Sequence, residues 1–427
     1  MNANNLYFHY VSDGREPRSR SARRLTIPRG ELISVVEREL AAGHRAACLT
    51  EYVGGAPDAG CFTISFDDAH ASIRDHAAPA LAQLGVAATL FVPTDYVGTG
   101  SELLSWDDLR ALRDAGWTLG SHSATHPRMG WRLYDEDEAA HRARLLDECA
   151  RSRDAMAKEL GEPPLLFAYP FGEAPDAARE AVAKAGYRAA FTVAQSPAWD
   201  GDPMRVPRVH GEPDAPLVEG ATADVPTGLS VIVPAFDRVR MLSEVVTRLA
   251  WQRYPEDRYE VIVVDDGSRE DIRPIFAEMP DNVRCVRQGD GAFRAGQARQ
   301  RGAELARHEV LVFLDADVAV GLDFLWHLDW VHRRVPDAVL LGYLSGYNLH
   351  DLGHVHTLDE VRGADVDRMR VIPDRSREPV LRACFDHLEW LDDPWTLTYT
   401  GNVSLPRSLL ARIGGFSDAF VGWGLED

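Results

Sequence analysis

The sequence predicts an α/β protein with two domains, a distorted parallel (β/α) barrel followed by a doubly wound sheet. Two observations favour this organisation. The chain has 427 residues with 45% apolar content, which exceeds the size at which a single core stops growing. Residues 211–228 are rich in Pro, Gly, Ala and acidic residues and lack periodicity, as is typical of a linker. We therefore expect domains at residues 1–210 and 229–427.

In the first block, short runs rich in β-forming residues alternate with amphipathic segments. We expect strands at residues 61–66, 87–92 and 165–169, and helices at residues 105–115 and 176–185. This alternation is typical of a parallel sheet or barrel in which each strand is followed by a covering helix.

In the second block, the expected strands are near-continuous apolar runs at residues 229–236, 259–266 and 309–317. Such runs indicate parallel strands that are buried on both faces. Helices are expected at residues 241–252 and 296–307. Ligands of doubly wound sheets bind at the carboxyl ends of the strands, and acidic residues end two of these three runs.

The charge and cysteine content exclude several classes of partner. The formal net charge of −20 argues against sequence-independent binding to nucleic acid or to anionic lipid surfaces. The five cysteines lack CxxC spacing, so they indicate neither a disulfide framework nor a thiolate zinc site. The N-terminus has no apolar signal segment, and no stretch approaches the ~18 apolar residues of a spanning helix. We expect a cytoplasmic protein without an integral membrane segment.

The first candidate site follows the expected strand at residues 61–66. Asp67 and Asp68 end that strand, and His122 and His126 lie four residues apart in the segment SHSATHP. Two imidazoles at that spacing can face one direction from a single helical turn and, with one carboxylate, form a three-ligand site for zinc or a similar divalent ion. If Asp68 binds the metal, Asp67 is free to act as a general base. In the alternative interpretation, the carboxylates cap a helix and the histidines are polar surface.

Taken together, these motifs resemble the NodB-like polysaccharide deacetylases, in which FDD at a strand end is followed by HSxxH. The resemblance covers roughly residues 5–210 and includes YFHYV at residues 7–11 and AYPFG at residues 168–172. It implies hydrolysis of the N-acetyl group of a sugar. Asp67 would be the base, Asp68, His122 and His126 would hold the metal, and the backbone N–H of Phe171 would support the oxyanion.

Three positions depart from that family's pattern. Ala69 replaces a common Gly, Ala168 replaces a common Arg that pairs with the base, and a late LxH motif is not evident. Without an Arg at position 168, we expect Asp67 to lack a cationic neighbour and to have a less depressed pKa. His210 is the candidate for the late general acid, and a solvated loop histidine is the alternative interpretation.

The second candidate site lies at the ends of three expected strands, which supply Asp265, Asp266, Asp315 and Asp317. A D-x-D sequence at a strand end offers hard oxygen ligands for Mg²⁺ or Mn²⁺ on a nucleotide diphosphate. D-x-D alone more often marks a turn or a helix cap.

The segments VDDGS and VFLDADV, with the helix expected from residue 296, resemble family 2 glycosyltransferases with a GT-A fold. The resemblance runs from residue 229 to the last residue. It implies that Asp317 coordinates the metal and that Asp427, with Glu426 as its neighbour, deprotonates the acceptor in an inverting single displacement. The donor would lie beside Pro234, Ala235, Phe236, Asp265, Asp266, Arg299 and Asp315. Trp423 is a candidate platform for an acceptor sugar, or a packed core indole.

The sequence ends at Asp427, whereas family members normally continue with helices that brace this segment. The chain is therefore expected to be a truncated product, or to have its acceptor site completed by another chain.

These inferences combine into a bifunctional bacterial enzyme that removes an N-acetyl group and transfers a sugar from a nucleotide donor. The acceptor would be a glycan or a glycosylated small molecule. In a second interpretation the first domain is a non-catalytic carbohydrate-binding module, and in a third the whole chain is a weakly active remnant. The donor sugar, the acceptor and the oligomeric state are not specified by these residues.

Overall fold

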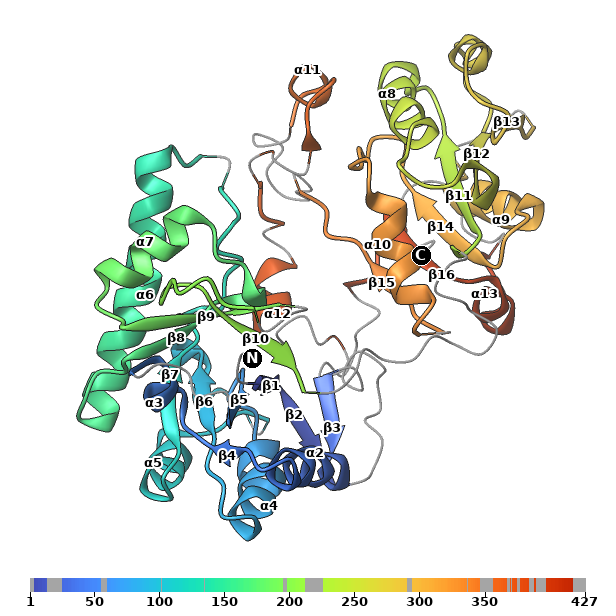
Figure 1. Cartoon of the computed structure of the whole chain (residues 1–427). Helices are drawn as coiled ribbons and strands as arrows, with labels where there is room; N and C mark the ends of the chain where they lie inside the picture. The colour runs from blue at the N-terminus through green and yellow to red at the C-terminus, as the bar shows by residue number, and fades with distance from the viewer. Residues whose placement is uncertain are drawn as a thin grey trace. The chain divides into compact units, whose positions relative to one another are not determined.

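The computed structural model of the protein divides into two compact units. Unit 1 comprises Met1–Ala215 with Glu378–Asp392, and unit 2 comprises Pro216–Arg377 with Asp393–Asp427 (Figure 1). The structure describes residues 4–13, 25–54, 60–100, 102–133, 135–194, 198–211, 226–289, 294–335, 337–345, 356–366, 369, 371–374, 377–383, 388 and 397–417. Most of the predicted linker, residues 212–225, lies outside them.

Unit 1 is a closed barrel of seven parallel strands, as predicted. The strand order is β1-β10-β9-β8-β7-β6-β5, and pairing of β1 with β5 closes the barrel. The short β4 (Arg45–Ala46) also pairs with β5. The seven strands are β1 (Asn4–Phe8), β5 (Cys61–Phe66), β6 (Thr89–Val92), β7 (Thr118–Ser121), β8 (Leu166–Ala168), β9 (Ala189–Val193) and β10 (Val206–His210).

Helices surround the barrel (Figure 1). The expected helices at residues 105–115 and 176–185 are confirmed as α5 and α7, and Ser105 begins α5 with a capping box that it shares with Asp108. A separate parallel pair, β2 (Tyr10–Ser12) and β3 (Thr26–Pro28), follows β1. The helical elements of unit 1 are α2 (Arg29–Ala41), α3 (Leu49–Gly54), η1 (Ile73–Ala77), α4 (Ala78–Gln83), η2 (Thr94–Tyr96), α5 (Trp106–Asp114), α6 (Glu138–Leu160), η3 (Pro170–Gly172), α7 (Asp176–Lys184) and α12 (Glu378–Ala383).

Successive side chains of β5 point alternately toward the surrounding helices and into the barrel, and this alternation positions Asp67 of the first candidate site. Phe62, Ile64 and Phe66 belong to the apolar cluster that includes residues of the surrounding helices. The intervening side chains point into the barrel, where the Ser65 hydroxyl donates to the carbonyl of Leu6 on β1. Asp67 continues this inward series at the carboxyl end of β5, so the strand period itself directs its carboxylate into the barrel.

Unit 2 is a mixed six-stranded sheet, in agreement with the predicted GT-A fold. The order is β13-β12-β11-β14-β16-β15, in which the first four strands are parallel and β16 is antiparallel to β14 and β15. The strands are β11 (Leu229–Ala235), β12 (Tyr259–Asp265), β13 (Val283–Arg287), β14 (Val310–Leu314), β15 (Leu340–Leu341) and β16 (Asn402–Pro406).

Helices cover both faces of this sheet. Val231 and Val233 belong to the apolar cluster on the α8 and α10 side, whereas Ile232 belongs to the cluster on the α9 side. Gly302 lets α9 approach closely, because a Cβ atom there would lie 2.3 Å from Ile232 Cγ2. The helical elements are α8 (Val239–Ala250), η4 (Glu256–Arg258), η5 (Arg273–Phe276), α9 (Ala295–Leu305), α10 (Phe324–His332), α11 (Leu358–Val361) and α13 (Arg407–Ile413).

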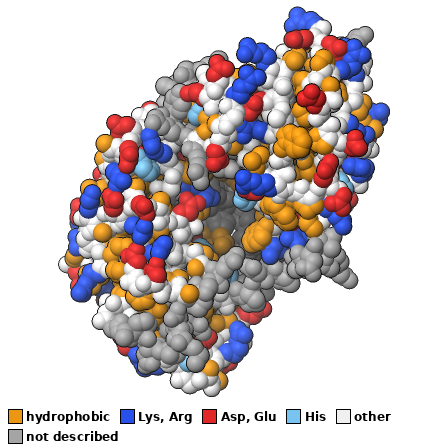
Figure 2. Space-filling model, turned by 45° about the horizontal axis from the view of Figure 1, so that its top comes forward, with side chains coloured by type: hydrophobic (Ala, Val, Ile, Leu, Met, Phe, Trp, Pro, Cys, Tyr) orange, Lys and Arg blue, Asp and Glu red, His pale blue; other side chains and the backbone are white. Residues whose placement is uncertain are grey.

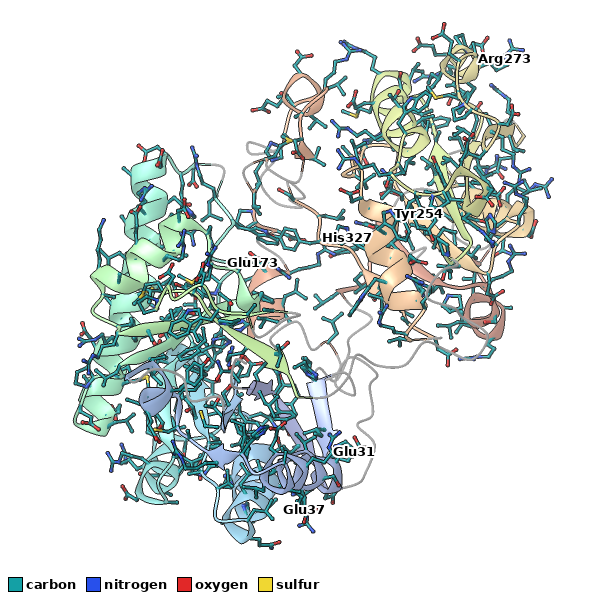
Figure 3. All side chains as sticks on the ribbon, in the orientation of Figure 1. Glu31, Glu37, Glu173, Tyr254, Arg273 and His327 are labelled. Carbon is teal, nitrogen blue, oxygen red and sulfur yellow. The ribbon has the colours of Figure 1, made fainter. Side chains whose placement is uncertain are left out.

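A buried carboxylate on α10 fastens the chain just before β11. Asp329 accepts hydrogen bonds from the Thr227 N–H at 2.6 Å and from the Tyr254 hydroxyl at 3.1 Å, and it pairs with Arg333 at 2.9 Å. Figure 3 shows Tyr254 beside α10, the helix that carries His327. The end of the predicted linker, at Thr227, is therefore packed against unit 2.

The surface carries charges of both signs. On the face shown in Figure 2, acidic and basic side chains are interspersed without a large area of a single sign. In the described parts of the chain, no helix combines the length and the apolar character needed to cross a membrane.

Candidate metal centre and nucleotide-sugar site

Asp67 forms a buried, two-pronged ion pair with Arg208 of β10. The Arg208 Nη1 and Nη2 atoms donate to Asp67 Oδ1 and Oδ2 at 2.7 and 2.8 Å, and the residues are 0% and 3% exposed. Arg208 also donates to the Ser65 hydroxyl at 3.1 Å. The expectation that Asp67 lacks a cationic neighbour is therefore wrong. Because β10 closes the barrel beside β1, its arginine supplies the charge that Ala168 on β8 does not.

The pair keeps Asp67 ionised. Burial by itself would raise the pKa of this carboxyl, but Arg208 and the nearby imidazoles of His122 and His9 outweigh burial and lower the pKa. A carboxylate that is charged throughout the neutral range can accept a proton, and the fixed guanidinium sets its orientation.

Asp68 turns away from Asp67 and faces two histidines. Its Oδ1 atom lies 3.6 Å from His122 Nε2 and 3.4 Å from His126 Nε2, and the two Nε2 atoms are 3.2 Å apart. Asp68 Oδ2 accepts a hydrogen bond from the Tyr10 hydroxyl at 3.2 Å. Within the described residues, Asp68 Oδ1 is buried without a hydrogen-bond donor.

This arrangement fits a divalent cation. One ligand atom from each of Asp68, His122 and His126 lies within 4.8 Å of the other two. A buried carboxylate oxygen without a donor is costly unless a cation or proton compensates it. One oxygen and two imidazole nitrogens form the mixed ligand set that zinc accepts while keeping a position open.

The surroundings of both histidines suit this role. His122 Nδ1 lies 2.8 Å from the carbonyl oxygen of Ala168, which can only accept, so Nδ1 carries the proton and Nε2 presents its lone pair to the site. Burial, opposed by Asp68, lowers the pKa of His126 to about 3, so this imidazole is neutral. Ala168 thus contributes to the site through its backbone carbonyl, which orients His122.

The histidine segment differs from the predicted helical turn. Residues 122–126 form no helix, and Ser123 and His126 adopt left-handed backbone conformations with φ of 68° and 53°. Ala69, at φ 54°, has the conformation that the glycine common at this position would adopt with less strain. Five of the six non-glycine residues with positive φ in the described structure lie here, namely Asp68, Ala69, Ser123, His126 and Phe171. Such clustering is typical of functional sites.

Polar groups on α6 hold this strained segment. Glu148, 7% exposed, accepts hydrogen bonds from the Thr125 N–H at 2.9 Å and from the Thr125 hydroxyl at 2.8 Å. The Ser152 hydroxyl lies 2.6 Å from that of Ser121 at the end of β7. The sequence interpretation missed Glu148 and Ser152, although two polar residues four apart on the inner face of a helix are a detectable signal.

His210 lies near the site but outside the three-ligand cluster. It follows Arg208 on the same side of β10, and its ring centre lies 5.1 Å from that of Tyr7. His9, which the sequence interpretation did not assign, is also close. Burial lowers the pKa of His9, while the charges of Asp68 and Asp67 oppose this shift.

Replacing Arg208 by Met should leave the Asp67 carboxylate buried and uncompensated. We expect the free energy of unfolding of unit 1 to fall by about 3–5 kcal/mol, as for other broken buried ion pairs. Urea denaturation of the full chain would measure this loss.

The double variant Asp67→Asn/Arg208→Met provides the control for this prediction. Because it removes both charges, it should recover a large part of the loss. Arg205→Met, which removes an exposed arginine paired with Asp200, should have little effect. If the single Arg208 variant were as stable as the natural chain, the inferred role of the ion pair would be wrong.

In unit 2, the predicted carboxylates at the end of β12 are buried among arginines. Asp265 accepts from the Ser268 N–H at 2.9 Å and from Arg287 Nη1 at 3.1 Å. Asp266 accepts from Arg294 Nη2 and from Gln288 Nε2, both at 2.9 Å. These cationic neighbours were not predicted.

The end of β11 joins this edge. Pro234 and Ala235 are the last residues of β11, and Phe236 follows them. The Asp266 N–H donates to the carbonyl of Ala235 at 2.9 Å, so the predicted residues of β11 and β12 meet where the sheet ends.

The D-x-D carboxylates follow β14 and also pair with arginines. Arg299 of α9 donates to Asp315 at 2.8 Å, and Arg238 forms an ion pair with Asp317. Burial raises the pKa of Asp317; Arg238 opposes this shift and the charge of Asp315 adds to it. A divalent cation at this position would offset the repulsion between the two carboxylates, so the residues present fit such an ion.

The remaining predicted residues of the second site, Glu426 and Asp427, lie outside the described residues, as does Trp423.

Comparison with known families matches one segment in each half of the chain. Residues 54–190 match the polysaccharide deacetylase family, and residues 230–328 match glycosyl transferase family 2. The chain therefore contains one domain of each family.

Two relatives show the similarity in more detail. The chain is 35% identical over 219 residues to validoxylamine A glucosyltransferase of Streptomyces hygroscopicus subsp. jinggangensis (strain 5008), covering 49% of the chain and 51% of the relative. It is 30% identical over 220 residues to hyaluronan synthase of Pasteurella multocida, covering 47% of the chain and 22% of the relative. The chain thus spans about half the length of the first relative and less of the second.

Among solved structures, the chain is similar to a de-N-acetylase from Aggregatibacter actinomycetemcomitans, with a TM-score of 0.44 and 18% identity over 49% of this chain and 96% of that one.

Proposed function

We propose that the chain carries out two reactions on sugars, hydrolysis of an N-acetyl group in the barrel and inverting transfer from a nucleotide sugar in unit 2. The observation that supports the first reaction best is the separation of Asp67, paired with Arg208, from Asp68, which faces two imidazoles. Adjacent carboxylates in different environments suit different tasks.

In the barrel, Asp68, His122 and His126 would hold Zn²⁺ or a similar divalent ion, which as a Lewis acid would polarise the acyl oxygen and lower the pKa of water. Asp67, oriented by Arg208, accepts the proton of the attacking water.

Two further groups would complete the acyl transfer. The backbone N–H of Phe171 donates to the oxyanion of the tetrahedral intermediate. His210 donates a proton to the departing amine, so that the sugar leaves as a neutral amino sugar and acetate is the second product.

Asp67→Asn should reduce acetate release from N-acetylated oligosaccharides by at least about a hundredfold, because the base is lost. Stoichiometric zinc should remain bound, since Asp68 and both histidines are intact. The His122→Ala/His126→Ala double variant should lose zinc and acetate release together, and a chelator should have the same effect on the unaltered chain.

Asp107→Asn, which changes an exposed carboxylate on α5, is the matched control and should leave both measurements unchanged. Persistent acetate release from the double-histidine variant would exclude this assignment.

In unit 2, we propose that the donor nucleoside binds beside residues 234–236 and 265–266, and that Arg299 and Asp315 lie beside the diphosphate. Asp317 would hold Mn²⁺ or Mg²⁺, which would neutralise charge on the diphosphate leaving group. Asp427, which follows Glu426 in the sequence, would be the base that deprotonates the acceptor hydroxyl. The names of the two relatives, a glucosyltransferase and a hyaluronan synthase, support this class of reaction.

Asp317→Asn should reduce manganese-dependent hydrolysis of the preferred donor by about a hundredfold or more, because a ligand of the cation is lost. The donor would first be found by a screen of UDP-, GDP- and TDP-sugars. Asp323→Asn, which alters a nearby exposed carboxylate paired with Arg253, should retain activity and serves as the control. Equal turnover by both variants would contradict the assignment of Asp317.

The alternative, a barrel that only binds carbohydrate, is motivated by Ala69, by Ala168 and by the lack of an evident late LxH motif. The absence of an arginine at position 168 no longer favours this alternative, because Arg208 supplies the cationic partner of Asp67. Purified protein without stoichiometric zinc but with normal donor hydrolysis would favour this alternative.

A further inference from the structure

An arginine is stacked against the loop beside the barrel site. The Arg128 guanidinium carbon lies 3.9 Å from the centre of the Phe171 ring and 5.2 Å from that of Trp131. The Phe171 ring centre lies 4.9 Å from that of His126, a residue of the metal-binding cluster. The side chains of Trp131, Arg128, Phe171 and His126 thus contact one another in succession.

Phe171 requires such support. Its φ of 58° is unfavourable for an aromatic residue, and 39% of it is exposed, so burial in the core does not hold it. On its C-terminal side the chain is fixed by Gly172, where a Cβ atom would lie 2.6 Å from Val193 Cβ. The Phe171 ring itself is contacted by the Arg128 guanidinium and by the His126 ring.

Arg128 is itself held in place. Its Nη1 atom donates at 3.1 Å to Glu173, which directly follows η3. Glu173 is labelled in Figure 3. Its carbonyl accepts from the Trp131 N–H at 3.1 Å, and the Trp131 carbonyl accepts from Arg144 of α6 at 2.9 Å. The backbone of the Arg128–Trp131 segment is therefore anchored to the same helix that holds the histidine segment, and the guanidinium is held by Glu173.

We propose that Arg128 is a positioning residue. It clamps Phe171 against His126 and so fixes the Tyr169–Gly172 loop, whose amide is assigned to the oxyanion. The inference rests on the proposed deacetylation for its effect on rate. The clamp itself is a property of the folded chain and is measurable without substrate. A cation over an aromatic face contributes enough to hold one loop conformation against thermal opening.

The first test is amide hydrogen exchange of the full chain. The Gly172 N–H donates to the Tyr169 carbonyl at 2.8 Å and reports on closure of the loop. In Arg128→Ala, a peptide covering this amide should exchange about tenfold faster than in the natural chain. Arg142→Ala, which removes an exposed arginine of α6, is the matched control and should exchange at the natural rate.

A second variant separates the clamp from general damage to the fold. If Arg128 acts through the Phe171 ring, Arg128→Ala should add little to the exchange rate in a Phe171→Leu background. Equal exchange in the natural chain and in Arg128→Ala, or an undiminished effect in the Phe171→Leu background, would overturn the proposal.

Acetate release then tests the catalytic consequence. Arg128→Ala should lower kcat about tenfold, with KM within about twofold and full zinc content, and Arg128→Lys should recover only part because it lacks the planar face. If Arg128→Ala exchanged faster but kept its kcat, the clamp would have no effect on catalysis. Absence of acetate release from the natural chain would instead refute the proposed deacetylation, and the exchange data would still decide on the clamp.

Discussion

Two adjacent carboxylates, Asp67 and Asp68, are both buried at the end of β5 and point in different directions, and the rest of unit 1 is arranged around this constraint. Asp67 continues the inward series of β5, whereas Asp68, at φ 72°, leaves the strand in a left-handed conformation. Charges buried this deeply are unstable unless each is compensated. Arg208 compensates the first carboxylate. A cation bound by the second carboxylate and the two imidazoles beside it would compensate the second.

The cost of this geometry falls on the surrounding structure. Left-handed conformations at Asp68, Ser123, His126 and Phe171 each oppose folding by about 1–3 kcal/mol. At Ser123 and His126 they persist because α6 (Glu138–Leu160) offers buried polar groups to the segment that carries them. Glu148 fixes the histidine segment through both the backbone and the side chain of Thr125. The site is therefore a property of barrel and helix together.

The sequence predicted the parts of this arrangement that depend on local pattern. A run of β-forming residues located β5, and the D-D and H-x-x-x-H spacings identified Asp68 and the two imidazoles, whose ligand atoms the structure brings within 4.8 Å of one another. The sequence did not predict contacts that depend on which distant strands pair in the sheet. Arg208 meets Asp67 only because β10 and β5 flank β1 in the closed barrel, which no local spacing encodes. The expected helical turn between the histidines was wrong because a bend of left-handed residues replaces it.

In unit 2, likewise, the expected strand ends predicted where the carboxylates lie, but the sequence did not predict their arginine partners. Arg287 and Arg294 reach Asp265 and Asp266 from segments more than twenty residues further along the chain. Both units therefore place acidic groups at the ends of parallel strands and balance them with arginines from distant elements.

Zinc K-edge X-ray absorption of the reconstituted full chain tests the central claim most directly, because it reports the atoms around the ion. The account predicts two imidazole nitrogens and at least one oxygen at about 2.0–2.2 Å, with a spectrum that changes in Asp68→Asn and is preserved in Asp67→Asn. A spectrum that changes in Asp67→Asn and not in Asp68→Asn would contradict the division of roles between the two carboxylates.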